Sequence, residues 1–104
     1  MAPMPSAIAS RQIVAIDAAG LEFALTIGIG APYQISESEW ACPLSMAGLY
    51  ERLHDAHGVD SWQALQLAVR LINDLLAHFI EQGGRLYLPE GREPVSLEEL
   101  FPRF

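Results

Sequence analysis

The sequence contains a single cysteine, no lysine and no long uninterrupted apolar run, and each shortage excludes a class of protein. The one cysteine, Cys42, cannot form a disulfide within the chain, so the cysteine count gives no sign of an oxidising compartment. Arg70, Asp74 and His78 interrupt the longest apolar segment, which therefore falls short of the roughly 18 residues that suggest a membrane-spanning helix. We expect no membrane segment.

Positive charge is also scarce, because six arginines face 13 acidic residues and the formal net charge is −7. The arginines are scattered from Arg11 to Arg103, whereas nucleic-acid binding needs a concentrated positive surface. A negative net charge also opposes attraction to anionic lipid. The composition therefore argues against nucleic acid and membranes as partners. It is compatible with a basic protein or a cationic ligand, and solubility alone also explains it.

The N-terminal segment MAPMPSAIASR lacks a basic stretch, and its apolar run is too short for a secretory signal peptide. Prolines and small side chains predict that residues 1–9 form a disordered lead-in. Residues 10–104 are expected to form one α+β domain, since domains cluster around roughly 100–150 residues. With neither a signal peptide nor a membrane segment, we expect a cytoplasmic protein.

Apolar residues are abundant by contrast, at 51% of the chain, while charged residues make up 18%. Ordinary soluble domains carry about 25% charged residues. A chain of 104 residues has a small interior in which to bury that much apolar surface. A homodimer interface is the simplest way to bury the excess apolar surface, and we therefore expect self-association.

Alternation of apolar and polar residues predicts several strands. From residue 22 to residue 29 the larger apolar side chains occupy every second position, which is typical of a half-buried strand that Pro32 would end. A shorter strand is expected around residues 13–18. A hairpin turn at 18–20 would join the two.

The next part of the chain is less regular. Residues 33–39 are expected to form a polar loop, and residues 40–46 alternate again with Pro43 as the sign of an edge strand or a bulge. Residues 49–57 are ambiguous, because their apolar spacing fits a helix. A hairpin turn at Ala47 and Gly48 would instead lead the same residues back as a strand.

A long helix is expected from Asp60 onward. Asp60 is a good N-cap, and Gln63 occupies the position of a capping-box partner. The helix should continue to about Gln82, where Gly83 and Gly84 end it. A strand is expected at residues 85–88.

Strands followed by one long helix and a further strand, with short connections, indicate an α+β fold. We predict an antiparallel β-meander of four to five strands with one long α-helix packed on one face. Ser96 is expected to cap a short turn of helix over residues 97–101.

The predicted helix is apolar over roughly 220° of its circumference, more than the stripe of about 100° that one packed face needs. Ala68, Ile72 and Phe79 lie at the centre of this arc and are expected to contact the sheet. Leu71 and Leu67 should reach past the sheet edge, where C-terminal residues such as Leu100 and Phe101, or a second subunit, would cover them. Trp62 is either an interface anchor or part of the core. The candidate interface residues are Trp62, Leu67 and Leu71.

Two histidines lie close together in the segment HDAH, at His54 and His57. On a helix, residues three apart share a face, and such a pair would suit a metal ion or a proton relay. On a strand, the two side chains would point to opposite faces. Cys42 and His78 are far away in the sequence and supply no evident third ligand, so we predict no metal site.

No other motif predicts catalysis. Cys42 would be a nucleophile only with a histidine beside it, and a small buried strand cysteine is the more common case. The segment GIGAP at 28–32 lacks the third glycine and the helix start of a phosphate-binding loop. The pairs of neighbouring glutamates lie in a polar loop and on a terminal turn, where solvated surface is the default. We therefore assign no catalytic residue and no cofactor.

The segments WACPLSMAGL, GVDSWQALQLAVRLI and GGRLYL together resemble a family of small, uncharacterised bacterial proteins. In that family a Trp-x-Cys strand precedes a helix that starts with Gly-x-Asp-Ser-x-Gln-Ala-Leu-Gln-Leu-Ala. The resemblance covers residues 27–88 and implies a meander of antiparallel strands leading into one long helix. It implies a strand over residues 49–57, which weakens the histidine-pair idea further. It implies no catalytic residue or ligand.

Two functions remain compatible with the sequence. The first is a non-enzymatic protein-interaction module of accessory or immunity type, a small acidic homodimer that binds another protein. The second is a small-ligand-binding module or weak enzyme with a groove between sheet and helix. The residues that would line this groove are Trp40, Cys42, Tyr50, His54 and His57. We favour the first, because the wide apolar arc and the acidity support it and no convincing polar constellation supports the second.

Overall fold

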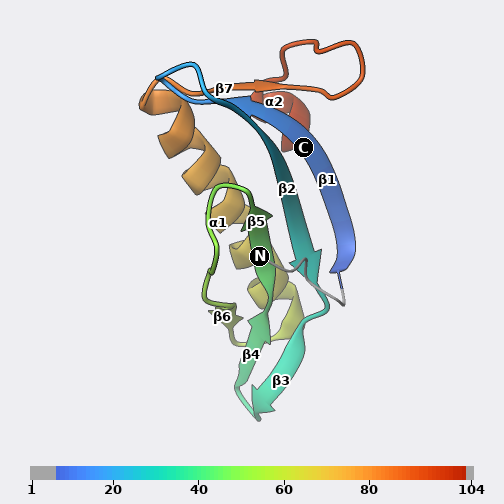
Figure 1. Cartoon of the computed structure of the whole chain (residues 1–104). Helices are drawn as coiled ribbons and strands as arrows, with labels where there is room; N and C mark the ends of the chain where they lie inside the picture. The colour runs from blue at the N-terminus through green and yellow to red at the C-terminus, as the bar shows by residue number, and fades with distance from the viewer. Residues whose placement is uncertain (1–6, 103–104) are drawn as a thin grey trace.

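Two antiparallel sheets and one long helix make up the computed structural model shown in Figure 1, which describes residues 7–102. The elements, in chain order, are β1 (Ala7–Ile16), β2 (Glu22–Gly30), β3 (Tyr33–Ser36), β4 (Glu39–Cys42), β5 (Leu44–Ala47), β6 (Ala56–Gly58), α1 (Ser61–Glu81), β7 (Arg85–Tyr87) and α2 (Leu97–Leu100). The larger sheet has the strand order β5-β2-β1-β7, and the smaller has the order β3-β4-β6. The predicted α+β class, with antiparallel strands and one long helix, is confirmed.

One long hairpin supplies strands to both sheets. Its first arm is β2 followed by β3, and its second arm is β4 followed by β5 (Figure 1). The arms are interrupted at Pro32 and Pro43, because proline has no N–H to donate to a strand ladder. The N–H of Gly30 still donates to the carbonyl of Pro43 at 2.9 Å, which holds the arms together at the break. The predicted irregularity at Pro43 is therefore the point where the chain changes sheets.

The β1–β2 hairpin turns where the sequence predicts. The side chain of Asp17 accepts hydrogen bonds from the N–H groups of Ala19 and Leu21, both at 2.9 Å. Gly20 has a φ of 88°, which glycine adopts without steric cost. Strand β1 begins at Ala7, so residues 7–9, expected in the disordered lead-in, belong to a strand instead. The rest of that lead-in, residues 1–6, lies outside the described residues.

Two segments differ from the sequence-based expectations. The predicted polar loop at 33–39 contains strand β3, a four-residue strand whose apolar side chains, Tyr33 and Ile35, are exposed. Most of the predicted strand at 49–57 is irregular, and only Ala56–Gly58 is a strand. Leu49 and Leu53 pack against the core from this irregular segment, which explains the apolar spacing that suggested regular structure.

Local signals determine both ends of α1. The Asp60 carboxylate accepts from the N–H of Gln63 at 2.8 Å, and the Gln63 side chain accepts from the N–H of Val59 at 2.8 Å. The predicted cap is therefore present, with its return bond one residue earlier than in a standard capping box. At the other end, Gly83 (φ 98°) and Gly84 donate to the carbonyls of Ile80 and Phe79, both at 2.9 Å. This is the Schellman arrangement.

The core lies between α1 and the two sheets. The helix buries Ala64, Ala68, Ile72 and Leu76, so the predicted contact face is confirmed at its centre. Phe79 is half-buried and meets Phe23 of β2 edge to face, with ring centroids 6.0 Å apart. The buried strand residues opposite the helix include Ile13, Ala15, Leu25, Ile29, Cys42, Leu44, Met46 and Leu86.

The C-terminal segment folds back along β7. The N–H of Leu88 donates to the carbonyl of Glu93 at 2.8 Å, and the N–H of Val95 donates to the carbonyl of Leu86 at 3.1 Å. The predicted short helix follows as α2, and its N-cap Ser96 forms a capping box with Glu99.

Candidate functional site

Strand β1 has one side that is only partly covered. Its ten residues pair with β2 along almost their whole length. On the other side, β7 pairs only with Val14, Ala15 and Ile16. Within the described range, no strand pairs with that side of residues 7–13, and we call these residues the open edge of β1.

Hydrogen bonds of β7 fix which backbone groups face the open edge. In an antiparallel ladder, the N–H and C=O of one residue point to the same side, and successive residues alternate. The carbonyl of Leu86 accepts from the N–H of Val95, so the backbone N–H and C=O groups of Leu86 point away from β1. The backbone groups of its neighbour Tyr87 therefore point toward β1 and exchange hydrogen bonds with those of Val14. Even-numbered residues of β1 consequently direct their backbone groups toward the β7 side.

The β2 ladder leads independently to the same assignment. The N–H of Gly30 donates to Pro43, so even-numbered β2 residues face β5 and odd-numbered residues face β1. Arg11 of β1 lies opposite an odd-numbered β2 residue and therefore bonds to it. Ser10 and Gln12 consequently present their N–H and C=O groups to the open edge.

An apolar groove of about 170 Å³ lies beside the open edge, between sheet and helix. Its lining consists of Ala9, Ser10, Arg11, Ile27, Gly28, Ile29, Val69, Ile72 and Phe101. Val69 of α1 is 38% exposed there, and Ile8 of β1 is 60% exposed. The open edge thus combines free backbone groups with a neighbouring apolar surface.

Charge around this groove differs from that of the chain as a whole. Strand β1 contains no acidic residue, although the chain has a net charge of −7. Arg11 supplies the one charged side chain among the described residues that line the groove. An acidic partner would therefore meet less repulsion here than at an average part of the surface.

Of the three predicted interface residues, Trp62 lies on one side of α1, and Leu67 and Leu71 lie together on the other. Trp62 is 69% exposed and precedes Val69 by two turns, on the flank that faces the groove. Leu67 is displaced from Trp62 by about 140° around the helix axis, and Leu71 by about 180°. Leu67 is 38% exposed and Leu71 is half-buried. One flat partner surface would therefore not contact all three. Phe101, expected beside Leu67 and Leu71, packs near Val69 instead.

The five predicted binding residues do not converge on one cavity. Trp40 is half-buried, and Cys42 is fully buried with its thiol donating to the carbonyl of Gly30 at 3.4 Å. Burial, with a smaller contribution from the carboxylate of Asp55, raises the pKa of the Cys42 thiol. A raised pKa disfavours the thiolate, which is the reactive form of cysteine. His57 lies opposite Ala41 in the ladder, so it points to the other face of the small sheet from Trp40.

The remaining two predicted residues lie in the irregular segment before β6. Tyr50 forms an isolated bridge with Met46, and His54 is exposed. The pockets that we describe here are lined by other residues. No group of three or more histidine, cysteine, aspartate or glutamate side chains within residues 7–102 is arranged to hold a metal ion.

Sequence reasoning missed a polar cluster on the outer face of the small sheet. The hydroxyl of Tyr33 donates to the carboxylate of Asp55 at 2.5 Å, and this bond raises the pKa of Tyr33. His57 Nδ1 lies 2.8 Å from a carboxylate oxygen of Glu39. The Tyr33 contact depends on β3, which the sequence did not reveal, and the contact between His57 and Glu39 depends on the pairing of β6 with β4. These contacts are exposed, and exposed polar pairs stabilise a fold only slightly.

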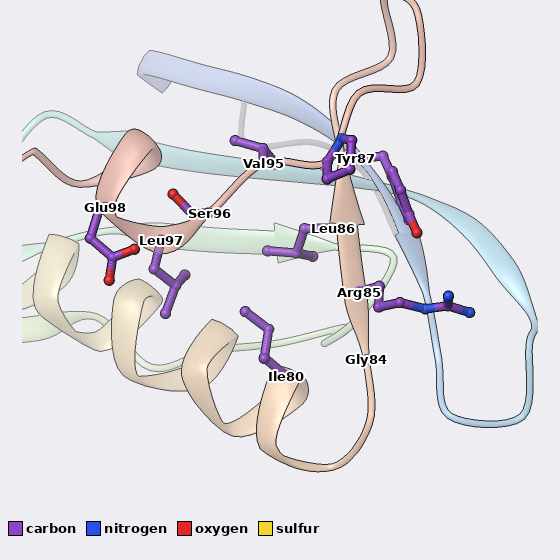
Figure 2. A pocket seen from close by; sticks show the side chains of 10 residues that line it. Ile80, Gly84, Arg85, Leu86, Tyr87, Val95, Ser96, Leu97 and Glu98 are labelled. Atoms are coloured by element: carbon purple, nitrogen blue, oxygen red, sulfur yellow. The ribbon is translucent and has the colours of Figure 1, made fainter.

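A second pocket, of about 430 Å³, lies under the C-terminal segment. Figure 2 shows its apolar walls, formed by Ile80 of α1, Leu86 of β7, and Val95 and Leu97 of the C-terminal segment. The side chains of Arg85 and Tyr87 lie on the other side of β7 from Leu86. The pocket is therefore predominantly apolar.

Fold and site together define a small α+β protein with one helix across two antiparallel sheets and an open strand edge. Comparison with known families places it more closely. The model of a domain of unknown function, DUF6968, matches residues 9–94, and the chain belongs to this family. The expected resemblance to an uncharacterised family is thus confirmed. No curated protein and no solved structure matches the chain. In the part of the chain that the structure describes, no helix is long and apolar enough to cross a membrane.

Proposed function

We propose that this protein is a non-enzymatic protein-interaction module that binds an extended segment of its partner along the open edge of β1. The observation that supports this proposal is the pair of outward-facing backbone groups at Ser10 and Gln12, beside an apolar groove. A strand added to a sheet edge gains affinity from main-chain hydrogen bonds and specificity from pockets for alternate side chains.

The energetics favour a partner with both kinds of contact. A hydrogen bond between the two proteins replaces hydrogen bonds to water and therefore contributes only about 0.5–1.5 kcal/mol net. A partner strand that bonds only to Ser10 and Gln12 would therefore bind weakly. An apolar side chain placed in the groove against Val69 and Phe101 adds burial worth about 1.5–3 kcal/mol when complete.

The surroundings of the reactive side chains favour a role without catalysis. Cys42 is enclosed by the core, and its thiol contacts a backbone carbonyl. The paired side chains of Tyr33 and Asp55 are exposed on the small sheet. We place the protein in the bacterial cytoplasm, as an accessory or immunity-type partner of another protein.

The test is capture of a partner from the native host with an edge-blocked variant as control. Ser10→Pro removes one outward N–H, while Ser10→Ala keeps it. We expect a partner recovered by the wild type and by Ser10→Ala to be lost with Ser10→Pro, with circular dichroism showing that all three are folded. A partner that binds Ser10→Pro equally well would refute the proposed edge.

A small apolar ligand is the second candidate, and the pocket under the C-terminal segment favours it. Its volume of about 430 Å³ falls within the roughly 300–1,000 Å³ of ligand sites. Medium-chain fatty acids should then raise the melting temperature of the wild type. Leu97→Trp, which fills the pocket, should abolish that increase, and an equal increase in both proteins would exclude this site.

A further inference from the structure

We propose that the open edge of β1 takes a second copy of this chain, with the two β1 strands antiparallel about a two-fold axis at Ser10. This inference rests on the proposed function, because it uses the same edge and names its occupant. The result would be one continuous sheet of eight strands, built from two copies of the four-stranded sheet.

Electrostatics restrict where two copies of this chain can meet. Each copy carries a net charge of −7, so contact through acidic surfaces places like charges together. Strand β1 has no carboxylate and carries Arg11. Two acidic copies can therefore approach each other through the open edge, because neither β1 strand places a carboxylate in the contact.

Backbone direction and charge together select the register. Ser10 and Gln12 direct their groups outward, so even-numbered residues must face even-numbered residues of the second copy. A register centred on Arg11 would place two arginines directly opposite each other, which is destabilising. A register centred on Ser10 instead places Arg11 opposite Ala9 and Gln12 opposite Ile8. Both registers keep Ser10 and Gln12 in the ladder, so the charge of Arg11 selects between them.

The same symmetry joins the apolar surfaces beside the two edges. A two-fold axis that reverses strand direction within a sheet is normal to that sheet, so both helices lie on the same face. The grooves that contain Val69 and Phe101 would then face each other across the new strand pair. Trp62, on the same flank of α1 and 69% exposed, adds apolar surface beyond the strands.

An uncovered edge of this composition needs a partner or a protecting feature. Natural proteins blunt edges with charges, prolines or bulges. Residues 7–13 carry one charge and no proline, and a register shift in the β1–β2 ladder lies between Ala7 and Ala9. This irregularity limits the pairing between the two β1 strands to a few residues around Ser10. We therefore expect a small interface and a dimer dissociation constant in the micromolar range.

Light scattering coupled to size-exclusion chromatography tests the inference directly. The wild type should approach twice the chain mass of 11.4 kDa as its concentration rises. Ser10→Pro should stay monomeric at least tenfold higher in concentration, while Ser10→Ala should dimerise as the wild type does. A wild type that stays monomeric at millimolar concentration, or a dimer that persists unchanged in Ser10→Pro, overturns the inference.

Charge reversal supplies a second variant with a matched control. Arg11→Glu and Arg70→Glu change the net charge equally, but Arg70 lies on the exposed face of α1 beside Asp74. Arg11→Glu should weaken the dimer at least tenfold more than Arg70→Glu. Equal weakening would indicate a general charge effect and would count against the edge.

Cysteine cross-linking tests the axis itself. Cα atoms of a hydrogen-bonded antiparallel pair are about 5.5 Å apart, within the range that a disulfide bridges. Ser10→Cys should therefore form disulfide-linked dimers under mild oxidation much faster than Ser36→Cys, an exposed position on β3. Equal rates would exclude an axis at Ser10.

The two proposals fail in different ways. If the purified protein stays monomeric and Ser10→Pro still loses a host partner, the second copy is excluded and the proposed function stands. If neither a dimer nor an edge-dependent partner is found, the proposed function fails as well.

Discussion

Proline substitutions along β1 offer a strict test of its backbone directions. Ser10→Pro removes an N–H that points to the open edge, whereas Arg11→Pro removes one that bonds to Ile27 of β2. The first change leaves the β1–β2 ladder intact. The second leaves the carbonyl of Ile27 without its donor in the middle of a sheet.

The expected difference follows from the cost of a lost hydrogen bond. An unsatisfied backbone group costs about 1–3 kcal/mol, and the proline ring adds steric strain where it replaces the N–H against β2. For a domain of this length, each kcal/mol corresponds to roughly 4–8 °C in melting temperature. Arg11→Pro should therefore melt at least about 4 °C below Ser10→Pro.

The assay is thermal and urea unfolding followed by circular dichroism, at a concentration low enough that any dimer is dissociated. Ser10→Ala and Arg11→Ala are the side-chain controls, and both should lie within about 0.5 kcal/mol of the wild type. Equal destabilisation by the two prolines would refute the assigned directions. The open edge would then have to be described with the odd-numbered residues facing outward.

Three further predictions concern the helix ends and the polar cluster. Asp60→Ala should lower the free energy of unfolding by about 1 kcal/mol, measured by urea denaturation. Asp60→Asn should retain most of the stability that the cap contributes, because asparagine also caps well. Gly84→Ala should destabilise by about 1–3 kcal/mol, because the added Cβ would lie 2.4 Å from the Phe79 ring; unchanged stability would show that the ring moves freely. Asp55→Asn should lower the pKa of Tyr33 toward its ordinary value in an ultraviolet absorbance titration, because the wild-type pKa is raised by donation to the Asp55 carboxylate. In the wild type this bond stabilises the fold while Tyr33 is protonated, so that contribution should be lost as pH rises through the raised pKa, and an unchanged titration in Asp55→Asn would exclude the bond.

Elements with local signals could be predicted from the sequence. The caps of α1 depend on residues within four positions of each other, at Asp60 and Gln63 and at the double glycine. Half-buried strands show alternation, and β2 was recognised by it. Strand β3 was missed because its alternation, Tyr33 and Ile35 with polar residues between and after them, extends over only four residues and runs into the polar segment 36–39.

The candidate site could not be predicted, because it depends on pairing between distant segments. β1 has an open edge only because its neighbour β7 is three residues long and pairs with the far end. Nothing within β1 itself indicates which strand lies beside it. Trp62 lies at the predicted helix start, but the side of α1 on which it lies relative to the open edge became clear only from the position of Val69 in the groove.

The hairpin that changes sheets at Pro32 and Pro43 has a consequence for unfolding. Each arm contributes one strand to the large sheet and one to the small sheet, and α1 packs against strands of both. Loss of either sheet would therefore leave half of the hairpin and part of the helix without support. The two sheets should behave as one cooperative unit, with amides of β2 and β4 exchanging hydrogen at the rate of global opening.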